Sequence, residues 1–434
     1  MASPKPVLQK SLSLKRELGL FEITLSGVGI ILGAGIYVLI GQAAGLAGTS
    51  VWLAFAISAV MALFTGLSYA ELSSMFPKAG AEYDYVEHAF SQQFASIIGW
   101  LVFLSGVLAA ATVALGFAGY FFALTGTPLT VSAIALIVLL AIILVHGVKE
   151  TAWVAIIATL IEMAGLVIII AIGAPHLGSV DYFEMPHGLH GLFAASALIF
   201  FAYQGFESMV KFAEETRDPE TTIPRALILA IAVSLVLYIL VALSVVSVLD
   251  WQQLAVSEAP FADIVSGTLG HDAAVIITVI ALFATANTVL MSMYASSRIL
   301  YGMAGSSLLL PGILGRVDDR KRTPWIAIAV CGLLSAGFLF AGDIAFVANV
   351  TNFTLFVTFI VINAAVIALR YRAPQIARPF KIPLAIGALP VLPVAGLVFC
   401  IFLLFQQDWS VLALGLGLTL TGVPFTLAGT GRGR

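Results

Sequence analysis

Charge is what this sequence has least of. Only 10% of its 434 residues are Asp, Glu, Lys or Arg, against roughly a quarter in ordinary soluble domains. The 20 basic and 23 acidic residues are too few to cover a soluble globule of this length. Because 61% of the residues are hydrophobic, intrinsic disorder is excluded as well. A net charge of −3 argues against a nucleic acid partner, which selects a basic face. The composition predicts an all-α membrane protein that crosses the lipid bilayer several times.

Cysteine is nearly absent, and so are the common catalytic motifs. Cys331 and Cys400 both lie inside apolar runs, which predicts small buried hydrophobic residues rather than a disulfide framework. No HExxH, GxSxG, P-loop or CxxC pattern occurs. His176, His187 and His190 share one expected outer loop, for which an ordinary loop is favoured over a metal site. We therefore expect no enzyme, no cofactor and no metal.

Twelve apolar segments are long enough, at about 20 residues each, to cross a bilayer. We number them helices 1 to 12. They are expected at residues 21–45, 51–70, 94–122, 129–147, 152–173, 190–210, 225–249, 272–298, 325–342, 345–370, 388–406 and 409–428.

The distribution of positive charge fixes the orientation of these helices. With the N-terminus inside and the helices alternating in direction, all 20 Lys and Arg residues fall in inner segments. Cytoplasmic loops carry such an excess of positive charge, and a wrong number of spans would scatter the basic residues. The pattern predicts a multi-pass protein of the plasma (inner) membrane with cytoplasmic segments at residues 1–20 and 429–434. The long apolar run of helix 1 argues against a cleaved signal peptide.

Glycines interrupt helix 1, which reads GVGIILGAGIYVLIG from residue 27 to 41. Glycine costs about 1 kcal/mol relative to alanine inside a helix. Close packing through small residues is one interpretation, and an unwound turn at Gly33-Ala34-Gly35 is the other. An unwound turn would present amides and the positive end of the outer half-helix to a carboxylate. Carbonyl groups that end the inner half-helix would suit an ammonium group.

Helix 6 carries a comparable interruption, with Gly205 at mid-span between Gln204 and Phe206. Helices 1 and 6 are five apart and run in opposite directions. Paired interruptions in corresponding spans are the best sequence indication of a transporter site built on inverted repeats. The sequence thus predicts that helices 1 and 6 are both broken near mid-membrane.

Two acidic residues remain deep in the apolar segments, Glu162 in helix 5 and Glu207 in helix 6. A charge at the bilayer centre costs at least a few kcal/mol, and burial favours the neutral acid. Glu162 is therefore a candidate proton carrier, the alternative being a permanently protonated residue with a structural role. Glu207 is either a proton-sensing acid beside a broken helix or a local cap for loosened amides.

Several stretches together resemble the amino acid–polyamine–organocation (APC) transporter superfamily, which has the leucine-transporter fold. The match extends over almost the whole chain. The stretches that carry it are GVGIILGAGI from residue 27, YAEL from 69, FPKAGAEY from 76, FAYQGFE from 201, EETRDP from 214, IPRA from 223, SRILYGMA from 297 and RPFK from 378.

The resemblance implies a 5+5 inverted repeat, at residues 21–173 and 190–370, followed by two extra helices at 388–428. It implies that the carboxylate of an amino acid substrate binds the amides of Gly33, Ala34 and Gly35. The amino group would meet carbonyls near Ile31 and Phe201. The pocket beside helix 6 would be lined by Tyr203 and Gln204.

Two departures from the family pattern bear on function. Many relatives carry Ser or Thr where this chain has Ala34, which removes one hydroxyl contact to the carboxylate. Some proton-coupled relatives carry a Lys in helix 5 that stands in for sodium, and Glu162 aligns with that position. Coupling by protonation is consistent with a Glu there but is not inherited from those relatives. On helix 8, Thr288 and Ser292 are candidate hydroxyls near the same place.

We therefore expect a secondary active transporter of amino acids or related amines that works by alternating access. A proton is the preferred coupling ion over sodium, with Glu162 as the carrier. An amino acid exchanger without net proton coupling is one alternative, and a non-transporting amino acid sensor is another. A cationic substrate would need an acid in the pocket, for which Glu207 is the only nearby candidate, whereas a neutral substrate needs only apolar walls.

Overall fold

The computed structural model describes residues 18–77, 81–146, 152–306, 312–318 and 323–424. The described chain is almost entirely helical, and its only sheet is a two-stranded hairpin, β1 (Ala385–Ile386) with β2 (Leu389–Pro390). The all-α fold predicted from composition is confirmed. Residues 1–17 of the expected cytoplasmic segment 1–20, and all of the expected tail 429–434, lie outside the described residues.

The helices follow the expected spans closely. Helices 1 to 5 correspond to α1 (Leu20–Leu32) with α2 (Gly35–Ala47), α3 (Val51–Met75), α5 (Gln92–Thr125), α6 (Leu129–His146) and α7 (Ala152–Gly173). Helices 6 to 10 correspond to α8 (Gly188–Ile199) with η3 (Phe200–Tyr203) and η4 (Phe206–Glu214), α9 (Pro219–Val248), α12 (His271–Ser306), α13 (Trp325–Phe338) and α14 (Ile344–Arg372). Helices 11 and 12 are α15 (Val391–Leu404) and α16 (Trp409–Leu420).

The number of bilayer crossings is less sharply defined than the helices. Within the described residues, eight segments are each long and apolar enough to span, and the pair α15–α16, bent by 118°, makes a ninth if taken as one. The helices α1 and α13 have only 13 and 14 residues. At 1.5 Å per residue they reach about 20 Å, less than the hydrocarbon thickness of about 30 Å. The chain is a multi-pass membrane protein, and the count of twelve stays a prediction.

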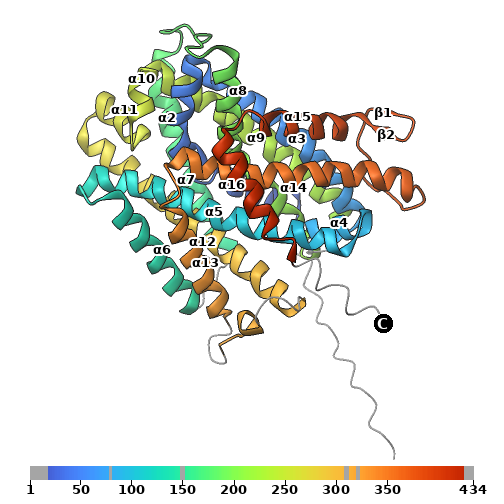
Figure 1. Cartoon of the computed structure of the whole chain (residues 1–434). Coiled ribbons are helices and arrows are strands. Elements are labelled where there is room, and N and C mark those ends of the chain that lie inside the picture. Colours follow the sequence, from blue (N-terminus) through green and yellow to red (C-terminus); the bar gives the residue numbers. More distant parts are fainter. Residues whose placement is uncertain (1–17, 78–80, 147–151, 307–311, 319–322, 425–434) are drawn as a thin grey trace, which may run out of the picture.

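Short elements mark the two ends of the bundle. At the left of Figure 1 lie α10 (Trp251–Val256) and α11 (Pro260–Leu269), both in the expected outer loop between helices 7 and 8. At the right lie α4 (Ala81–Ala89) and the β1–β2 hairpin, both in expected inner loops. The long helices α5 and α14 run between these two ends. Besides η3 and η4, the described residues form three short 3₁₀ segments, η1 (Gly48–Ser50), η2 (Ala174–His176) and η5 (Gly312–Gly315).

Helices that stand five apart in the chain pack against one another. Helix 2 (α3) packs on helix 7 (α9), helix 3 (α5) on helix 8 (α12), and helix 4 (α6) on helix 9 (α13). In the same way, α1 and α2 of helix 1 contact η4 and α8 of helix 6. A two-fold relation between two five-helix units would produce these pairs.

A buried ion cluster joins the inner ends of helices 2 and 10. The Glu71 carboxylate, which has no exposed surface, accepts hydrogen bonds from Arg370 Nε at 2.9 Å and Nη2 at 2.5 Å. It also accepts the N–H of Ile382 at 2.9 Å, and Arg378 Nε lies 3.4 Å from it. The loop after helix 10 is thereby fastened to helix 2.

A second set of contacts holds the inner half-helices. Leu18 N donates to the carbonyl of Glu215 at 3.1 Å, and Arg217 N donates to the carbonyl of Leu18 at 2.9 Å. These bonds form a parallel β-bridge between Leu18, just before α1, and Thr216, just after η4. Below them, Glu82 of α4 lies 3.9 Å from Lys211 of η4. The short helix α4 packs on α5 and α14 and approaches helix 6 through this ion pair.

Candidate functional site

Helix 1 is interrupted at the predicted position. The segment α1 ends at Leu32, and α2 begins at Gly35 after a turn at Gly33 and Ala34. A Cβ at Gly35 would lie 2.6 Å from the Cα of Ala202 in helix 6, closer than any side chain can come. The turn is therefore unwound, and Gly35 packs directly on the backbone of the other broken helix.

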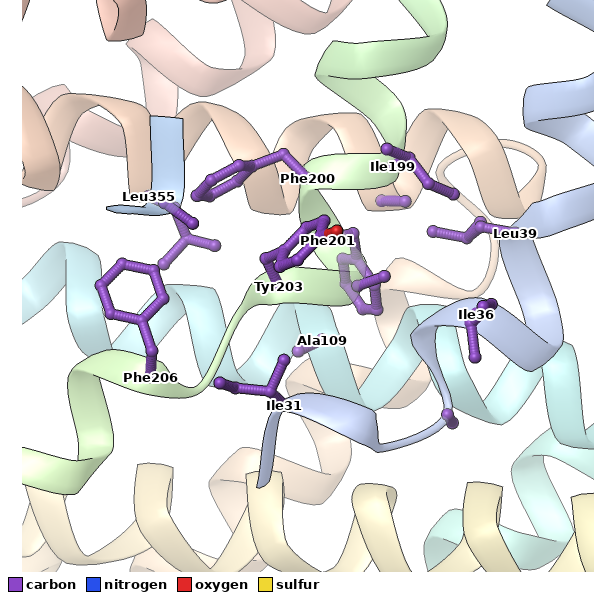
Figure 2. Packing of buried hydrophobic residues seen from close by; sticks show 14 of the residues in the cluster. Ile31, Ile36, Leu39, Ala109, Ile199, Phe200, Phe201, Tyr203, Phe206 and Leu355 are labelled. Carbon is purple, nitrogen blue, oxygen red and sulfur yellow. The ribbon is translucent and has the colours of Figure 1, made fainter. Parts of the chain in front are cut away.

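Helix 6 is interrupted more extensively than the sequence predicted. Its outer part α8 ends at Ile199 and continues as the 3₁₀ turn η3, and its inner half η4 is also a 3₁₀ helix. Between them Gly205 has φ +116°, a conformation that favours glycine, and a Cβ there would lie 2.5 Å from Ile30 Cγ2. Figure 2 shows this part of the chain passing beside helix 1, with Phe201 and Tyr203 on one break and Ile31 and Ile36 on either side of the other.

Side chains from helices 2 and 10 cap the carbonyls that end α8. Ser58 Oγ donates to the carbonyl of Ser196 at 2.7 Å. Asn352 Nδ2 donates to the carbonyls of Ala197 and Leu198 at 2.7 and 3.0 Å. Bare backbone groups cost several kcal/mol in hydrocarbon, so these caps stabilise the break. Sequence reasoning did not identify either residue, although an Asn within an apolar helix is a signal that points to one.

The carboxylate site is predicted at the start of α2. Its first-turn amides have no partner within the helix, and they carry the positive end of the helix dipole. Ala34 N donates to Thr288 Oγ1 at 3.1 Å, so the structure brings the helix 8 hydroxyl to this turn. Ser292 lies one turn further along helix 8, and its place near this turn stays a prediction.

Carbonyls of both broken helices converge beside Ile31, where the sequence predicts the ammonium site. The carbonyl oxygens of Ile31 and Ala202 both accept from Tyr238 Oη of helix 7, at 2.6 and 2.8 Å. The carbonyl of Phe201, named from the sequence, instead accepts the N–H of Gln204 at 3.2 Å within the 3₁₀ turn. Sequence reasoning missed Tyr238, because a lone Tyr in an apolar helix gives no sign that it joins helices 1 and 6.

Two polar atoms at the helix 6 break have no hydrogen-bond partner among the described residues. They are Tyr203 Oη and Gln204 Oε1, both buried. The Tyr203 ring packs edge-on against Tyr238, with centroids 5.1 Å apart. Buried polar groups are almost always paired, and an unpaired one marks a place for water, an ion or a ligand. Both residues are thus placed where a polar ligand between the broken helices would meet them.

Glu162 is almost fully buried, at 1% exposure, and is linked to the helix 1 break through helix 8. Its Oε1 accepts from Asn287 Nδ2 at 3.3 Å, and the next residue, Thr288, accepts from Ala34. Its backbone carbonyl accepts from Tyr37 Oη of α2 at 2.6 Å. Sequence reasoning missed Asn287, whose polar side chain directly precedes a residue that it had identified.

Glu207 makes the capping contact that was one of its two interpretations. Its Oε2 accepts the N–H of Gly205 at 2.8 Å, an amide that the break leaves without a helical partner. Glu207 lies one turn before Lys211, which in turn approaches Glu82. Within the part of the chain that the structure describes, no group of three His, Cys, Asp or Glu residues could hold a metal ion.

Comparison with known proteins gives one consistent class. Residues 18–419 match the family model described as amino acid permease. The chain is 32% identical over 419 residues to the branched-chain amino acid permease BcaP of Bacillus subtilis (strain 168), covering 92% of this chain and 89% of the relative. It is 31% identical over 422 residues to the methylthioribose transporter of the same organism, with coverage of 92% and 89%. It is 29% identical over 388 residues to the vacuolar cationic amino acid transporter 4 of Arabidopsis thaliana, with coverage of 83% and 64%.

Proposed function

This chain belongs to the amino acid permease family of the amino acid–polyamine–organocation superfamily, and from that membership we propose that it is a secondary active transporter of amino acids. It works by alternating access and carries no catalytic activity and no cofactor. Its two five-helix repeats, residues 21–173 and 190–370, surround the site, and both termini face the cytoplasm from the plasma membrane. The packing of helices five apart supports this division.

One observation carries the proposal. At the two breaks, the amide end of α2 adjoins a pair of carbonyls, those of Ile31 and Ala202, that already converge on a single donor. An α-amino acid presents a carboxylate and an ammonium group on one carbon. Amides at a helix N-terminus suit the first group, and converging carbonyls suit the second. Backbone groups thereby recognise the part that all amino acids share.

The side-chain class that fits best is neutral and apolar. Glu207, the only nearby acid that could pair with a cationic side chain, is engaged with the amide of Gly205. Apart from the polar groups already described, the side chains around the breaks include many apolar ones, among them Phe201, Phe206 and Ile36. The Bacillus subtilis relative is named a branched-chain amino acid permease, and branched-chain amino acids are neutral and apolar.

Proton symport is the proposed driving mechanism. Glu162 is joined by Asn287 and Thr288 to Ala34, so a change in its protonation alters hydrogen bonding that leads to the carboxylate site. A protonated Glu162 is stable in the low-dielectric interior, whereas an ionised Glu162 requires a compensating charge or hydrogen-bond donor. An exchanger in which Glu162 is purely structural is the alternative, and a non-transporting sensor is the alternative of another class.

Uptake into liposomes that hold the purified protein tests these alternatives. Labelled leucine, isoleucine and valine would be compared with lysine and arginine, without sodium, under an imposed or a collapsed proton gradient. We expect leucine, isoleucine and valine to accumulate only with the gradient. Uptake that requires internal amino acid and ignores the gradient would make the protein an exchanger. Binding without flux would make it a sensor, and preferred uptake of lysine would overturn the proposed side-chain class.

A further inference from the structure

The hydroxyl of Tyr238 occupies a point that two broken helices share. It lies 2.6 Å from the carbonyl oxygen of Ile31 and 2.8 Å from that of Ala202. Its ring is held between Phe55 of helix 2 and Tyr203 of helix 6, at centroid distances of 5.4 and 5.1 Å. Tyr238 has no exposed surface. With no ligand bound, the packing of its ring thus holds the hydroxyl at a point where carbonyls of both breaks meet.

The Tyr238 hydroxyl has fewer hydrogen-bond donors than the two carbonyl oxygens beside it can accept. A phenol has one O–H to donate, and here two carbonyl oxygens lie within hydrogen-bonding distance of it. At any instant one of them is bonded and the other is left without a full partner. An ammonium group has three N–H donors, so it can satisfy both carbonyls and still donate once more. Replacing the phenol by an ammonium group thus converts one shared bond into two complete bonds.

We propose that the Tyr238 hydroxyl is a placeholder for the α-ammonium group of the substrate. It holds the carbonyls of Ile31 and Ala202 when the site is empty, and it gives them up when an amino acid binds. This inference rests on the proposed function and names a residue that determines specificity. It keeps both carbonyls from lying bare in an apolar interior, where an unpaired polar group is costly.

The placeholder selects against compounds that lack an amino group. A 2-hydroxy acid brings a single donor, so it gains nothing over the phenol that it must displace. A carboxylic acid with neither group leaves the phenol in place and makes no contact there. For an amino acid, displacement of the phenol has an energetic cost, and the measured affinity is lower than the carbonyls alone would give.

The test is the Tyr238→Phe variant, which removes the competing hydroxyl and keeps the ring. Dissociation constants would be measured for leucine, for 4-methylpentanoate and for 2-hydroxy-4-methylpentanoate. We expect the preference for leucine over 4-methylpentanoate to rise about three- to tenfold, the worth of one hydrogen bond. The control is Tyr120→Phe, because Tyr120 is equally buried and donates to the carbonyl of Tyr37 at 2.9 Å, inside an intact helix. The preference of the Tyr120→Phe variant for leucine over 4-methylpentanoate should equal that of the wild-type protein.

A second substitution keeps the test decisive if Tyr238→Phe does not fold. Placing 3-fluorotyrosine at position 238 retains the hydroxyl but makes it a stronger donor, so the preference for leucine should fall. An unchanged preference in both variants, or a fall in Tyr238→Phe, would overturn the inference and make Tyr238 a plain structural clamp. If the wild-type protein binds no amino acid at all, the proposed function fails; if it binds leucine and only the variants behave otherwise than expected, the inference alone fails.

Discussion

At the scale of single residues, polar side chains replace the backbone bonds that the two breaks remove. Tyr238 and Asn352 cap carbonyls of the broken helices, and Thr288 receives the amide of Ala34. Hydrocarbon offers no water to do this, so unwound backbone groups require other partners, and several here come from side chains of other helices. The polar residues of helices 7, 8 and 10 thereby make the irregular backbone at the site stable.

Glu162→Gln tests proton coupling. Gln is the neutral counterpart of a protonated Glu, and its side-chain oxygen can still accept from Asn287. We expect substrate binding to persist while accumulation no longer responds to the proton gradient, as measured by uptake into liposomes. Glu207→Gln is the control, because Glu207 is also buried but caps the amide of Gly205. Accumulation by this control should still respond to the gradient. Gradient-driven accumulation by the Glu162 variant would show that another group carries the proton.

Gly35→Ala tests the contact between the broken helices. Its Cβ would lie 2.6 Å from the Cα of Ala202, and backbone cannot move aside as a flexible side chain does. We expect loss of leucine binding by about tenfold or more, on the scale of overpacking costs of about 1–3 kcal/mol. Gly337→Ala is the control, since Gly337 lies in α13 and a Cβ there meets nothing within 4 Å. Equal binding by the two variants would contradict a site at this contact.

The sequence predicted those single residues that are energetically unfavourable in any surroundings. A glycine cluster inside a helix and an acid inside a bilayer are unfavourable whatever surrounds them, so Gly33, Gly35 and Glu162 are recognisable without a structure. Tyr238 and Asn287 carry no such penalty. Their importance depends on partners in other helices, among them Ile31 and Glu162, which only the folded chain brings together.

At the scale of elements, the inner side is held together by charge. The Glu71 carboxylate contacts both Arg370 and Arg378, and it accepts a hydrogen bond from the N–H of Ile382. Glu71 is fully buried, and the two Arg side chains are almost fully buried. A buried pair is weak evidence for net stability, but removal of one partner leaves the others uncompensated. Helix 10 and the loop after it therefore depend on one carboxylate of helix 2.

Glu71→Gln should destabilise the protein strongly. Two guanidinium groups would remain buried without a counter-charge, at a cost of about 3–5 kcal/mol. The midpoint of thermal inactivation in detergent should fall by several degrees, while Glu220→Gln, at an exposed position on the same side, should leave it within error. A Glu71 variant as stable as the Glu220 variant would mean that solvent reaches the cluster.

The elements divide into those that the sequence predicts and those that it does not. Spans of about 20 apolar residues were located well, because the bilayer thickness imposes their length. The 3₁₀ form of η4, the outer helices α10 and α11 and the β1–β2 hairpin were not predicted. Helical and 3₁₀ backbones differ by a small change in dihedral angles, so packing against neighbours decides between them.

At the scale of the whole molecule, the sequence predicts that the charges separate between two faces. The basic residues belong to the expected inner segments, and α4 and the hairpin lie in expected inner loops. The expected outer loops carry Glu184, Glu258 and Asp408 instead. We expect this asymmetry to orient the protein on insertion, because cytoplasmic loops retain positive charge.

Labelling of single cysteines tests the orientation and the number of spans. A membrane-impermeant maleimide applied to intact cells should modify Glu258→Cys and Asp408→Cys but not Glu220→Cys, all three positions being exposed. Permeabilised cells provide the control, in which all three react. Protection of residue 408 in intact cells would mean that α15 and α16 do not form two separate crossings.

The β-bridge between Leu18 and Thr216 has a kinetic consequence. Two backbone hydrogen bonds tie the start of α1 to the end of η4, so the inner parts of both broken helices share one rigid junction. We therefore expect α1 and η4 to move together rather than one after the other. Fluorophores on the two segments should report one concerted transition with one rate constant when substrate is added.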